Sequence, residues 1–284
     1  MEMKVIGVLG AGSMGNGIAQ VASQVGYQVI MRDIEDRFVQ SGLNAIGKFL
    51  TKSVEKGKMT EDQKKEVLSR IKGTTKMEDL KDADFIIEAI FEDLELKKNV
   101  FRQLDELTRS QVILTTNTSS MSVTEIAMAT KRPEKVAGMH FFNPAPLMRL
   151  VEVIRGYHTN DETVHIVMEM AKKLGKEPVE VKKDTPGFIV NRLMMPHMIE
   201  AIRMAEEGVA SIEDIDKAVK LGLNYPMGPF ELMDLTGVDI ALHVTEYLYK
   251  ELNKENKWSV PTLLRSMIRA GKLGRKTGAG WYKY

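Results

Sequence analysis

In the first part of the chain, short apolar runs alternate with segments in which apolar residues recur at helical spacing. A first apolar run, at residues 5–9, is typical of a buried parallel strand. The following apolar positions, from Ile18 to Val25, recur every three or four residues and predict one face of a helix. Another apolar run at residues 29–31 predicts a second strand. Together these segments predict a strand–helix–strand unit.

This alternation continues to about residue 181. Further strands are expected at residues 84–89, 112–116, 136–140, 150–154 and 178–181. Residues 35–72 predict a pair of helices, which is more chain than a simple crossover between two strands needs. The second helix should begin at Thr60, which forms a capping-box pattern with Gln63, and end near Gly73. We therefore expect a doubly wound, Rossmann-type α/β sheet with a projecting helical hairpin.

Beyond the sheet the hydrophobic period is helical almost to the end of the chain. Residues 184–187, Asp-Thr-Pro-Gly, form a natural boundary. The first helix after it is expected at residues 188–207, with a kink at Pro196. We expect an α/β domain at residues 1–185 and an all-α domain at residues 186–284.

The turn between the first strand and the first helix has the sequence Gly10-Ala11-Gly12-Ser13-Met14-Gly15. Gly10 allows a tight turn, Gly12 leaves room for a pyrophosphate, and Gly15 lets the helix pack closely on the strand. The helix N-terminus offers N–H groups and a partial positive charge to phosphates. A glycine-rich packing turn is the alternative, but the flanking strand and helix favour a dinucleotide site.

Asp33 follows the second strand at the distance expected for a ribose ligand. Its carboxylate would accept hydrogen bonds from the ribose hydroxyls and repel a 2′-phosphate, which favours NAD over NADP. Arg32 and Arg37 lie nearby in the sequence and could offset part of that repulsion.

Composition removes several classes of function. The 284 residues include 40 basic and 39 acidic side chains, so no global charge draws the chain to nucleic acid or to a membrane. There are no cysteines, which excludes disulfides, zinc–thiolate sites and thiol catalysis, and we expect no metal. No apolar run approaches the length of a membrane span. Residues 1–4 lead directly into the first strand, so we expect no signal or transit peptide and a cytoplasmic protein.

Among the five histidines, His140 differs because it ends an apolar strand beside the turn Phe-Phe-Asn-Pro-Ala-Pro. Glu152 interrupts another apolar strand, where an unpaired carboxylate would be costly. A His140–Glu152 pair could remove the proton of a secondary alcohol. The alternatives are a buried structural histidine and a salt bridge of Glu152 to Arg149 or Arg155.

Other polar groups are candidates for binding. The turn at residues 117–120, Asn-Thr-Ser-Ser, follows a strand at the sheet edge where ligands bind. Asn191, in the first helix of the second domain, could face a ligand or be an ordinary polar residue. The hairpin lysines could receive a polyanionic substrate or form a solvated helix face; they are Lys48, Lys52, Lys56, Lys58, Lys64 and Lys65.

In combination these motifs resemble the 3-hydroxyacyl-CoA dehydrogenases, specifically the short bacterial 3-hydroxybutyryl-CoA dehydrogenases. The resemblance covers essentially the whole chain. The motifs that carry it are, in order, residues 10–15, Asn117-Thr118-Ser119-Ser120, His140-Phe141-Phe142-Asn143-Pro144, Glu152, Pro186-Gly187-Phe188-Ile189-Val190-Asn191-Arg192 and Gly228-Pro229.

The resemblance implies an NAD-dependent oxidoreductase that interconverts (S)-3-hydroxyacyl-CoA and 3-oxoacyl-CoA. It implies domains that close over the substrate and a homodimer formed through the helical domain. His140 resembles the general base and Glu152 its partner, while Ser119 and Asn191 resemble the residues that bind the reacting oxygen or thioester. Cofactor contacts would come from Gly10, Gly12, Ser13, Met14, Gly15, Asp33, Glu92, Lys97, Asn117, Asn143 and Lys276. Lys52 and Lys56 match the region that receives coenzyme A.

Two other interpretations remain at this point. One is another β-hydroxyacid dehydrogenase, although the lysine usual in that group is not evident where Asn191-Arg192 stands. The other is a dinucleotide-binding protein without catalysis, which the set of Ser119, His140, Glu152 and Asn191 disfavours.

Overall fold

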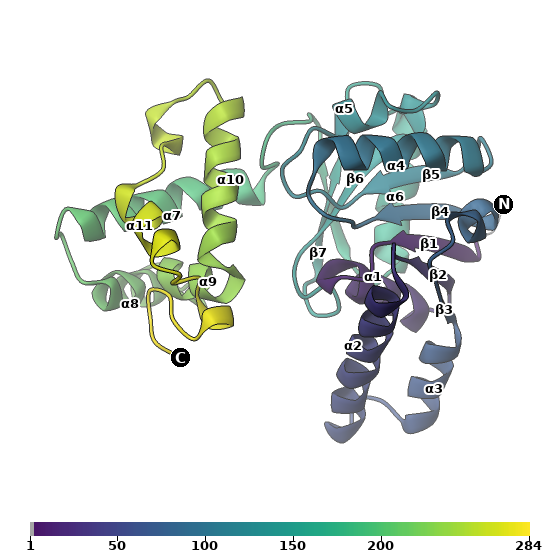
Figure 1. Cartoon of the computed structure of the whole chain (residues 1–284), viewed down its shortest axis with the longest axis horizontal. Coiled ribbons are helices and arrows are strands. Elements are labelled where there is room, and N and C mark those ends of the chain that lie inside the picture. Colours follow the sequence, from purple (N-terminus) through teal and green to yellow (C-terminus); the bar gives the residue numbers. More distant parts are fainter. Residues whose placement is uncertain (1–2) are drawn as a thin grey trace. The chain divides into compact units, whose positions relative to one another are not determined.

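The chain divides into two compact units in the computed structural model, one ending at Asp184 and one running from Thr185 to Tyr284 (Figure 1). The structure describes residues 3–284, so Met1 and Glu2, at the expected leaderless start, lie outside the described residues. The first unit is an α/β sandwich and the second is helical, which confirms the expected fold class. No helix of the described residues is both long enough and apolar enough to cross a membrane.

The sheet of the first unit has eight strands in the order β3-β2-β1-β4-β5-β6-β7-β8. The strands are β1 (Val5–Leu9), β2 (Gln28–Arg32), β3 (Ile71–Thr74), β4 (Phe85–Glu88), β5 (Ile113–Thr116), β6 (Val136–Phe141), β7 (Leu150–Ile154) and β8 (Glu177–Val181). Strands β1 to β6 run parallel, whereas β7 runs antiparallel to β6. The strand order reverses between β1 and β4, and in such sheets ligands bind beyond the carboxyl ends of the strands at that point.

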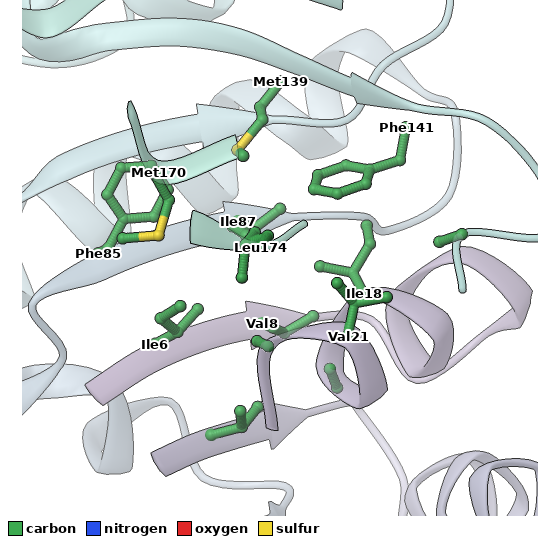
Figure 2. Packing of buried hydrophobic residues seen from close by; sticks show 14 of the residues in the cluster. Ile6, Val8, Ile18, Val21, Phe85, Ile87, Met139, Phe141, Met170 and Leu174 are labelled. Atoms are coloured by element: carbon green, nitrogen blue, oxygen red, sulfur yellow. The ribbon is translucent and has the colours of Figure 1, made fainter. Parts of the chain in front are cut away.

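Helices cover both faces of this sheet (Figure 1). One face carries α1 (Ser13–Gln24) and α6 (Asp161–Lys173), and the other carries α4 (Leu94–Leu107) and α5 (Val123–Ala127). Figure 2 shows the first of these cores, in which strand residues meet apolar side chains from α1 and from α6 and its C-terminal end. Its labelled members are Ile6, Val8, Ile18, Val21, Phe85, Ile87, Met139, Phe141, Met170 and Leu174. Because both faces are buried, the central strands are largely apolar, as the sequence pattern indicated.

The helical hairpin consists of α2 (Asp36–Glu55) and α3 (Glu61–Ser69), and it extends away from the sheet (Figure 1). The expected capping box is present, since Thr60 Oγ1 accepts from Gln63 N at 3.2 Å and Gln63 Oε1 accepts from Thr60 N at 2.8 Å.

The expected end of the second hairpin helix is wrong. Helix α3 ends at Ser69, and the next residues form the edge strand β3. A Cβ at Gly73 would lie 2.5 Å from Val39 Cγ1, so glycine serves here to let α2 pack on the strand. The sequence Ile-Lys-Gly-Thr has a single large apolar residue, and it therefore lacks the alternation that would predict a strand.

The second unit contains five α-helices among the described residues: α7 (Val190–Glu206), α8 (Ile212–Gly222), α9 (Pro229–Thr236), α10 (Val238–Glu251) and α11 (Thr262–Arg269). Its core includes Phe230, Met233 and Trp258. Helix α7 begins two residues later than expected, because Phe188 has φ +51°, outside the right-handed helical region.

Two buried carboxylates hold the end of the chain in the second unit. Asp216 Oδ1 accepts from Phe230 N at 2.9 Å, and its Oδ2 accepts from the Tyr282 hydroxyl at 2.7 Å. Asp234 accepts from the backbone N–H groups of Trp281 and Tyr282, each at 2.9 Å. These bonds fix the end of the loop at residues 271–280, in which the expected cofactor residue Lys276 lies.

Candidate active site

In the glycine-rich loop at residues 10–15, the packing of the chain requires glycine at two of the three glycine positions. Gly10 has φ +98°, and a Cβ there would lie 2.3 Å from the carbonyl oxygen of Ala89. A Cβ at Gly15 would lie 1.9 Å from the carbonyl oxygen of Gly10. The loop can therefore cross the ends of β1 and β4 only with glycine at these positions.

Gly12 is different, and it bears on the fit of a dinucleotide. A Cβ at Gly12 would meet no protein atom within 4 Å, so the chain itself does not demand glycine there. Gly12 is also the N-cap of α1, and no side chain caps that helix. Space beside the loop and N–H groups without a capping side chain are what a pyrophosphate requires. Ser13 and Met14 form the first turn of this helix.

Asp33 lies just past the end of β2 and fastens the loop. Its Oδ2 accepts a hydrogen bond from Ala11 N at 2.7 Å, and its Oδ1 accepts from Ile34 N at 2.7 Å. A carboxylate has about four acceptor positions. Asp33 can therefore hold the loop and still accept from ribose hydroxyls, so these residues fit an adenine dinucleotide.

His140 and Glu152 are directly opposite each other on β6 and β7. Nδ1 of His140 lies 2.8 Å from Oε2 of Glu152, and the two residues are only 6% and 1% exposed. With Nδ1–H donated to the carboxylate, a neutral imidazole carries its lone pair on Nε2, the nitrogen that can accept a proton. An imidazole held in this way can serve as an oriented general base.

The sequence left open whether Glu152 pairs instead with a neighbouring arginine. Arg149 forms an ion pair with Glu177. Arg155 lies 3.0 Å from Glu180 and 2.7 Å from Asp161. Both arginines are therefore engaged by other carboxylates.

The turn between β6 and β7 joins the pair to the nucleotide loop. Asn143 Oδ1 accepts from Ser13 Oγ at 3.3 Å. A Cβ at Gly17 would lie 3.1 Å from Pro146 Cδ, which shows how closely the turn packs on α1. Asn117 Oδ1 accepts from Phe141 N at 2.8 Å and so ties the end of β5 to the end of β6. Its amide NH2 is thus the group that Asn117 could offer to a ligand.

Lys176 holds the same turn from below, a role that sequence reasoning missed. Its buried ammonium donates to the carbonyl oxygens of Ala145 and Met148 at 2.6 and 2.9 Å. Burial lowers the pKa of Lys176. No sequence signal distinguishes this lysine from the surface lysines around it, because its acceptors are backbone carbonyls.

Glu92 and Lys97, both expected cofactor contacts, belong to one ionic network. Glu92 Oε1 accepts from Ser119 N at 2.9 Å and from Ser119 Oγ at 3.2 Å. Lys97 Nζ lies 3.2 Å from Glu92 Oε2 and 2.7 Å from Glu88 Oε1. Glu88 was missed, although it ends an apolar strand and the burial argument used for Glu152 applies equally to it.

Both pKa values in this network move toward the charged forms. Burial raises the pKa of Glu92, but the Lys97 charge and the hydrogen bonds from Thr118 and Ser119 outweigh it, so the pKa lies below its usual range. Burial lowers the pKa of Lys97, and the charges of Glu88 and Glu92 more than compensate.

The two hairpin lysines expected to bind coenzyme A are exposed at the end of α2. Lys48, Lys52 and Lys56 share one helix face by their spacing of four residues. Among the described residues none of the three has an acidic partner within 4 Å, whereas Lys65 lies 3.4 Å from Asp62. An anion could approach this face without displacing an ion pair.

Asn191 and Lys276 lie in the second unit. Asn191 is in the first turn of α7. Lys276 Nζ donates to Asp239 Oδ2 at 2.6 Å. The expected contacts of these residues with substrate and cofactor stay predictions. Residues 3–284 contain no group of three or more side chains arranged to hold a metal ion.

Both parts of the chain match the same family of known proteins. The family model described as "3-hydroxyacyl-CoA dehydrogenase, NAD binding domain" matches residues 5–185, and the C-terminal domain of the same family matches residues 187–284. A 3-hydroxybutyryl-CoA dehydrogenase of Clostridioides difficile is 48% identical over 279 residues, covering 98% of this chain and 99% of the relative. A probable 3-hydroxybutyryl-CoA dehydrogenase of Deinococcus radiodurans is 49% identical, with the same coverage.

Solved structures agree with these relatives. The crystal structure of (S)-3-hydroxybutyryl-CoA dehydrogenase from Ralstonia eutropha superposes with a TM-score of 0.95 at 46% identity, covering 100% of this chain and 99% of that one. The chain therefore belongs to the 3-hydroxyacyl-CoA dehydrogenase family of oxidoreductases.

Proposed function

We propose that this protein interconverts (S)-3-hydroxybutyryl-CoA and acetoacetyl-CoA with NAD as its cofactor. The observation that carries the proposal is the 2.8 Å contact between His140 Nδ1 and Glu152 Oε2. This pair belongs to strands of the same sheet that carries a dinucleotide loop, and a buried imidazole oriented by a carboxylate suits proton transfer from a secondary alcohol. The names of the relatives support the four-carbon substrate.

In the oxidative direction, Nε2 of His140 removes the proton from the C3 hydroxyl of the substrate. Glu152 holds the ring through Nδ1–H and stabilises the positive charge that forms on it. In the reductive direction, the imidazolium returns that proton to the oxygen as C3 is reduced. The dinucleotide that the glycine-rich loop and Asp33 would hold would supply the hydride acceptor for C3 and, in its reduced form, the hydride donor in the reverse direction.

Ser119 and Asn191 complete the proposed substrate site. Glu92 Oε1 holds the backbone N–H of Ser119 at 2.9 Å and also accepts from its hydroxyl at 3.2 Å. Because a serine has a single O–H donor, the Ser119 hydroxyl would turn from Glu92 to hydrogen-bond the reacting oxygen of the substrate, while its N–H stays held. Asn191 would reach the thioester from the second unit as the domains close. Closure would exclude water and align C3 for hydride transfer.

A homodimer formed through the helical unit is part of the proposal. That unit exposes several large apolar side chains, which an interface between two copies of the chain would cover. They are Leu193, Val209, Leu221, Leu223, Tyr225, Leu235 and Ile240.

The test is oxidation of NADH by acetoacetyl-CoA, with NADPH measured in parallel. We expect turnover with NADH and at least about tenfold less with NADPH, because about 1.4 kcal/mol of repulsion between Asp33 and the 2′-phosphate suffices for that ratio. Equal rates with the two cofactors would overturn the NAD preference alone. NADH binding without turnover would support a non-catalytic protein, and turnover of free acetoacetate instead of its thioester would support another hydroxyacid dehydrogenase.

Replacing both Lys52 and Lys56 by alanine is expected to raise the KM for acetoacetyl-CoA about 2- to 30-fold with little change in kcat, since exposed ion pairs contribute about 0.2–1 kcal/mol each. Acetoacetyl-pantetheine lacks the nucleotide part of coenzyme A, and its KM should not change. Lys65→Ala is the matched control, because Lys65 is an exposed hairpin lysine that lies 3.4 Å from Asp62. An equal rise in KM for both substrates would contradict a role in binding the nucleotide.

A further inference from the structure

Glu88 is a buried acid that the proposed mechanism does not use. It is the last residue of β4 and is 0% exposed. Its Oε1 accepts from Ile90 N at 2.8 Å, and its Oε2 accepts from the Thr116 hydroxyl at 2.7 Å. The same Oε1 lies 2.7 Å from Lys97 Nζ. Each carboxylate oxygen is thus held by a donor from a different element of the sheet edge.

Lys97 connects Glu88 to Glu92, in the loop that follows β4. Its side chain is 1% exposed, and its ammonium has three N–H donors. Acceptors are present for all three: Glu88 Oε1 at 2.7 Å, Glu92 Oε2 at 3.2 Å and the carbonyl oxygen of Ile90 at 3.5 Å. A direct contact of Lys97 with a ligand would require one of these bonds to break, so in this arrangement Lys97 acts through Glu92.

Glu92 in turn holds the turn that carries Ser119. Its Oε1 accepts three hydrogen bonds, from Thr118 Oγ1 at 2.5 Å, Ser119 N at 2.9 Å and Ser119 Oγ at 3.2 Å. The pKa of Glu92 lies below its usual range, and an ionised acceptor strengthens these bonds. A continuous path of charged hydrogen bonds therefore runs from Glu88 to the Ser119 hydroxyl.

We propose that Glu88 is a positioning residue for the reaction, acting through Lys97 and Glu92 to hold the Ser119 hydroxyl where the substrate oxygen binds. This inference rests on the proposed function, which assigns Ser119 to the substrate. Stability alone is a poor reason for the arrangement, because well-packed apolar residues are often as stabilising as a buried ion pair. The network instead secures one geometry at the residue where it ends.

The variant Glu88→Gln tests this inference because it keeps the shape of the side chain and removes the charge. We expect kcat for acetoacetyl-CoA to fall about 10- to 100-fold with a much smaller change in KM, the size of effect that a small displacement at a reacting centre produces. Glu88→Asp keeps the charge but shortens the side chain, and an intermediate kcat is expected. It also provides a second test if the glutamine variant folds poorly.

A second readout needs no turnover. In the protein without substrate, amide hydrogen exchange at residues 118–121 should become faster in Glu88→Gln, while exchange in strand β6 stays as in the wild type. Glu95→Gln is the matched control, since Glu95 is exposed on α4 and bonds only to Lys98, at 2.7 Å, among the described residues. It should change neither kcat nor exchange.

The outcomes separate the two proposals. If the wild type does not reduce acetoacetyl-CoA, the proposed function fails, whatever the exchange data show. If the wild type is active and Glu88→Gln alters neither kcat nor exchange at residues 118–121, the positioning role is overturned. Faster exchange throughout the first unit, with kcat reduced only in proportion to the folded fraction, would also overturn it, because that result describes a purely structural residue.

Discussion

Replacing His140 by glutamine is expected to lower kcat for acetoacetyl-CoA reduction about 10²- to 10⁴-fold, the contribution typical of a general acid–base group. The amide can still donate a hydrogen bond to Glu152, whose side chain lies 2.8 Å from the imidazole, but it cannot carry the transferred proton. The affinity for NADH should stay close to that of the wild type. Steady-state kinetics and a fluorescence titration with NADH measure the two effects.

The matched control for this variant is His158→Gln, which changes an exposed histidine of the same unit. It should leave both kcat and NADH affinity unchanged. A loss of NADH binding together with turnover in His140→Gln would indicate misfolding. Full activity in that variant would remove His140 from the mechanism.

Glu152→Gln should produce the second largest loss, about 10²- to 10⁴-fold in kcat, by analogy with loss of the carboxylate that orients a catalytic histidine. The introduced glutamine amide can donate a hydrogen bond to Nδ1 of His140, which favours the tautomer with hydrogen on Nε2. In that tautomer Nε2 has no lone pair with which to accept the substrate proton. The stabilisation of the imidazolium is lost as well. Comparison of kcat with the melting temperature distinguishes this effect from unfolding.

A double variant makes the test more specific. If the two side chains act as one unit, His140→Gln/Glu152→Gln should be about as slow as His140→Gln alone, because effects within a catalytic unit are not additive. Losses that multiply would show that Glu152 acts independently of the imidazole, contrary to the proposed mechanism.

Much of the fold could be predicted because its signals are local. Continuous apolar runs identified the central strands, and the pair Thr60 and Gln63 identified the start of α3. The edge strand β3 was missed because it has no such local signal. Its position depends on pairing with β2 and on the packing of Val39 over Gly73. Neither contact can be predicted from the sequence of the four strand residues.

The candidate site divides in the same way. Gly10 and Gly15 could be read from the sequence because a backbone geometry excludes other residues there. Glu152 could be suspected because a carboxylate in an apolar strand needs a partner. Glu88 was missed although the same argument applies to it, and Lys176 was missed because nothing in its sequence context distinguishes it from surface lysines. For both, the sequence does not show which groups form their hydrogen bonds.

The sequence by itself determined the α/β unit followed by a helical unit, the dinucleotide loop, and His140 and Glu152 as candidates for chemistry. These follow from periodicity and burial, which each segment expresses on its own. Only the tertiary structure decided which groups meet. The antiparallel direction of β7 sets Glu152 opposite His140, and the adjacency of β4, β5 and α4 joins Glu88 to the Ser119 turn. The physical reason is that a hydrophobic pattern records whether a side chain is buried, whereas its partner depends on the order and direction of strands far apart in the sequence.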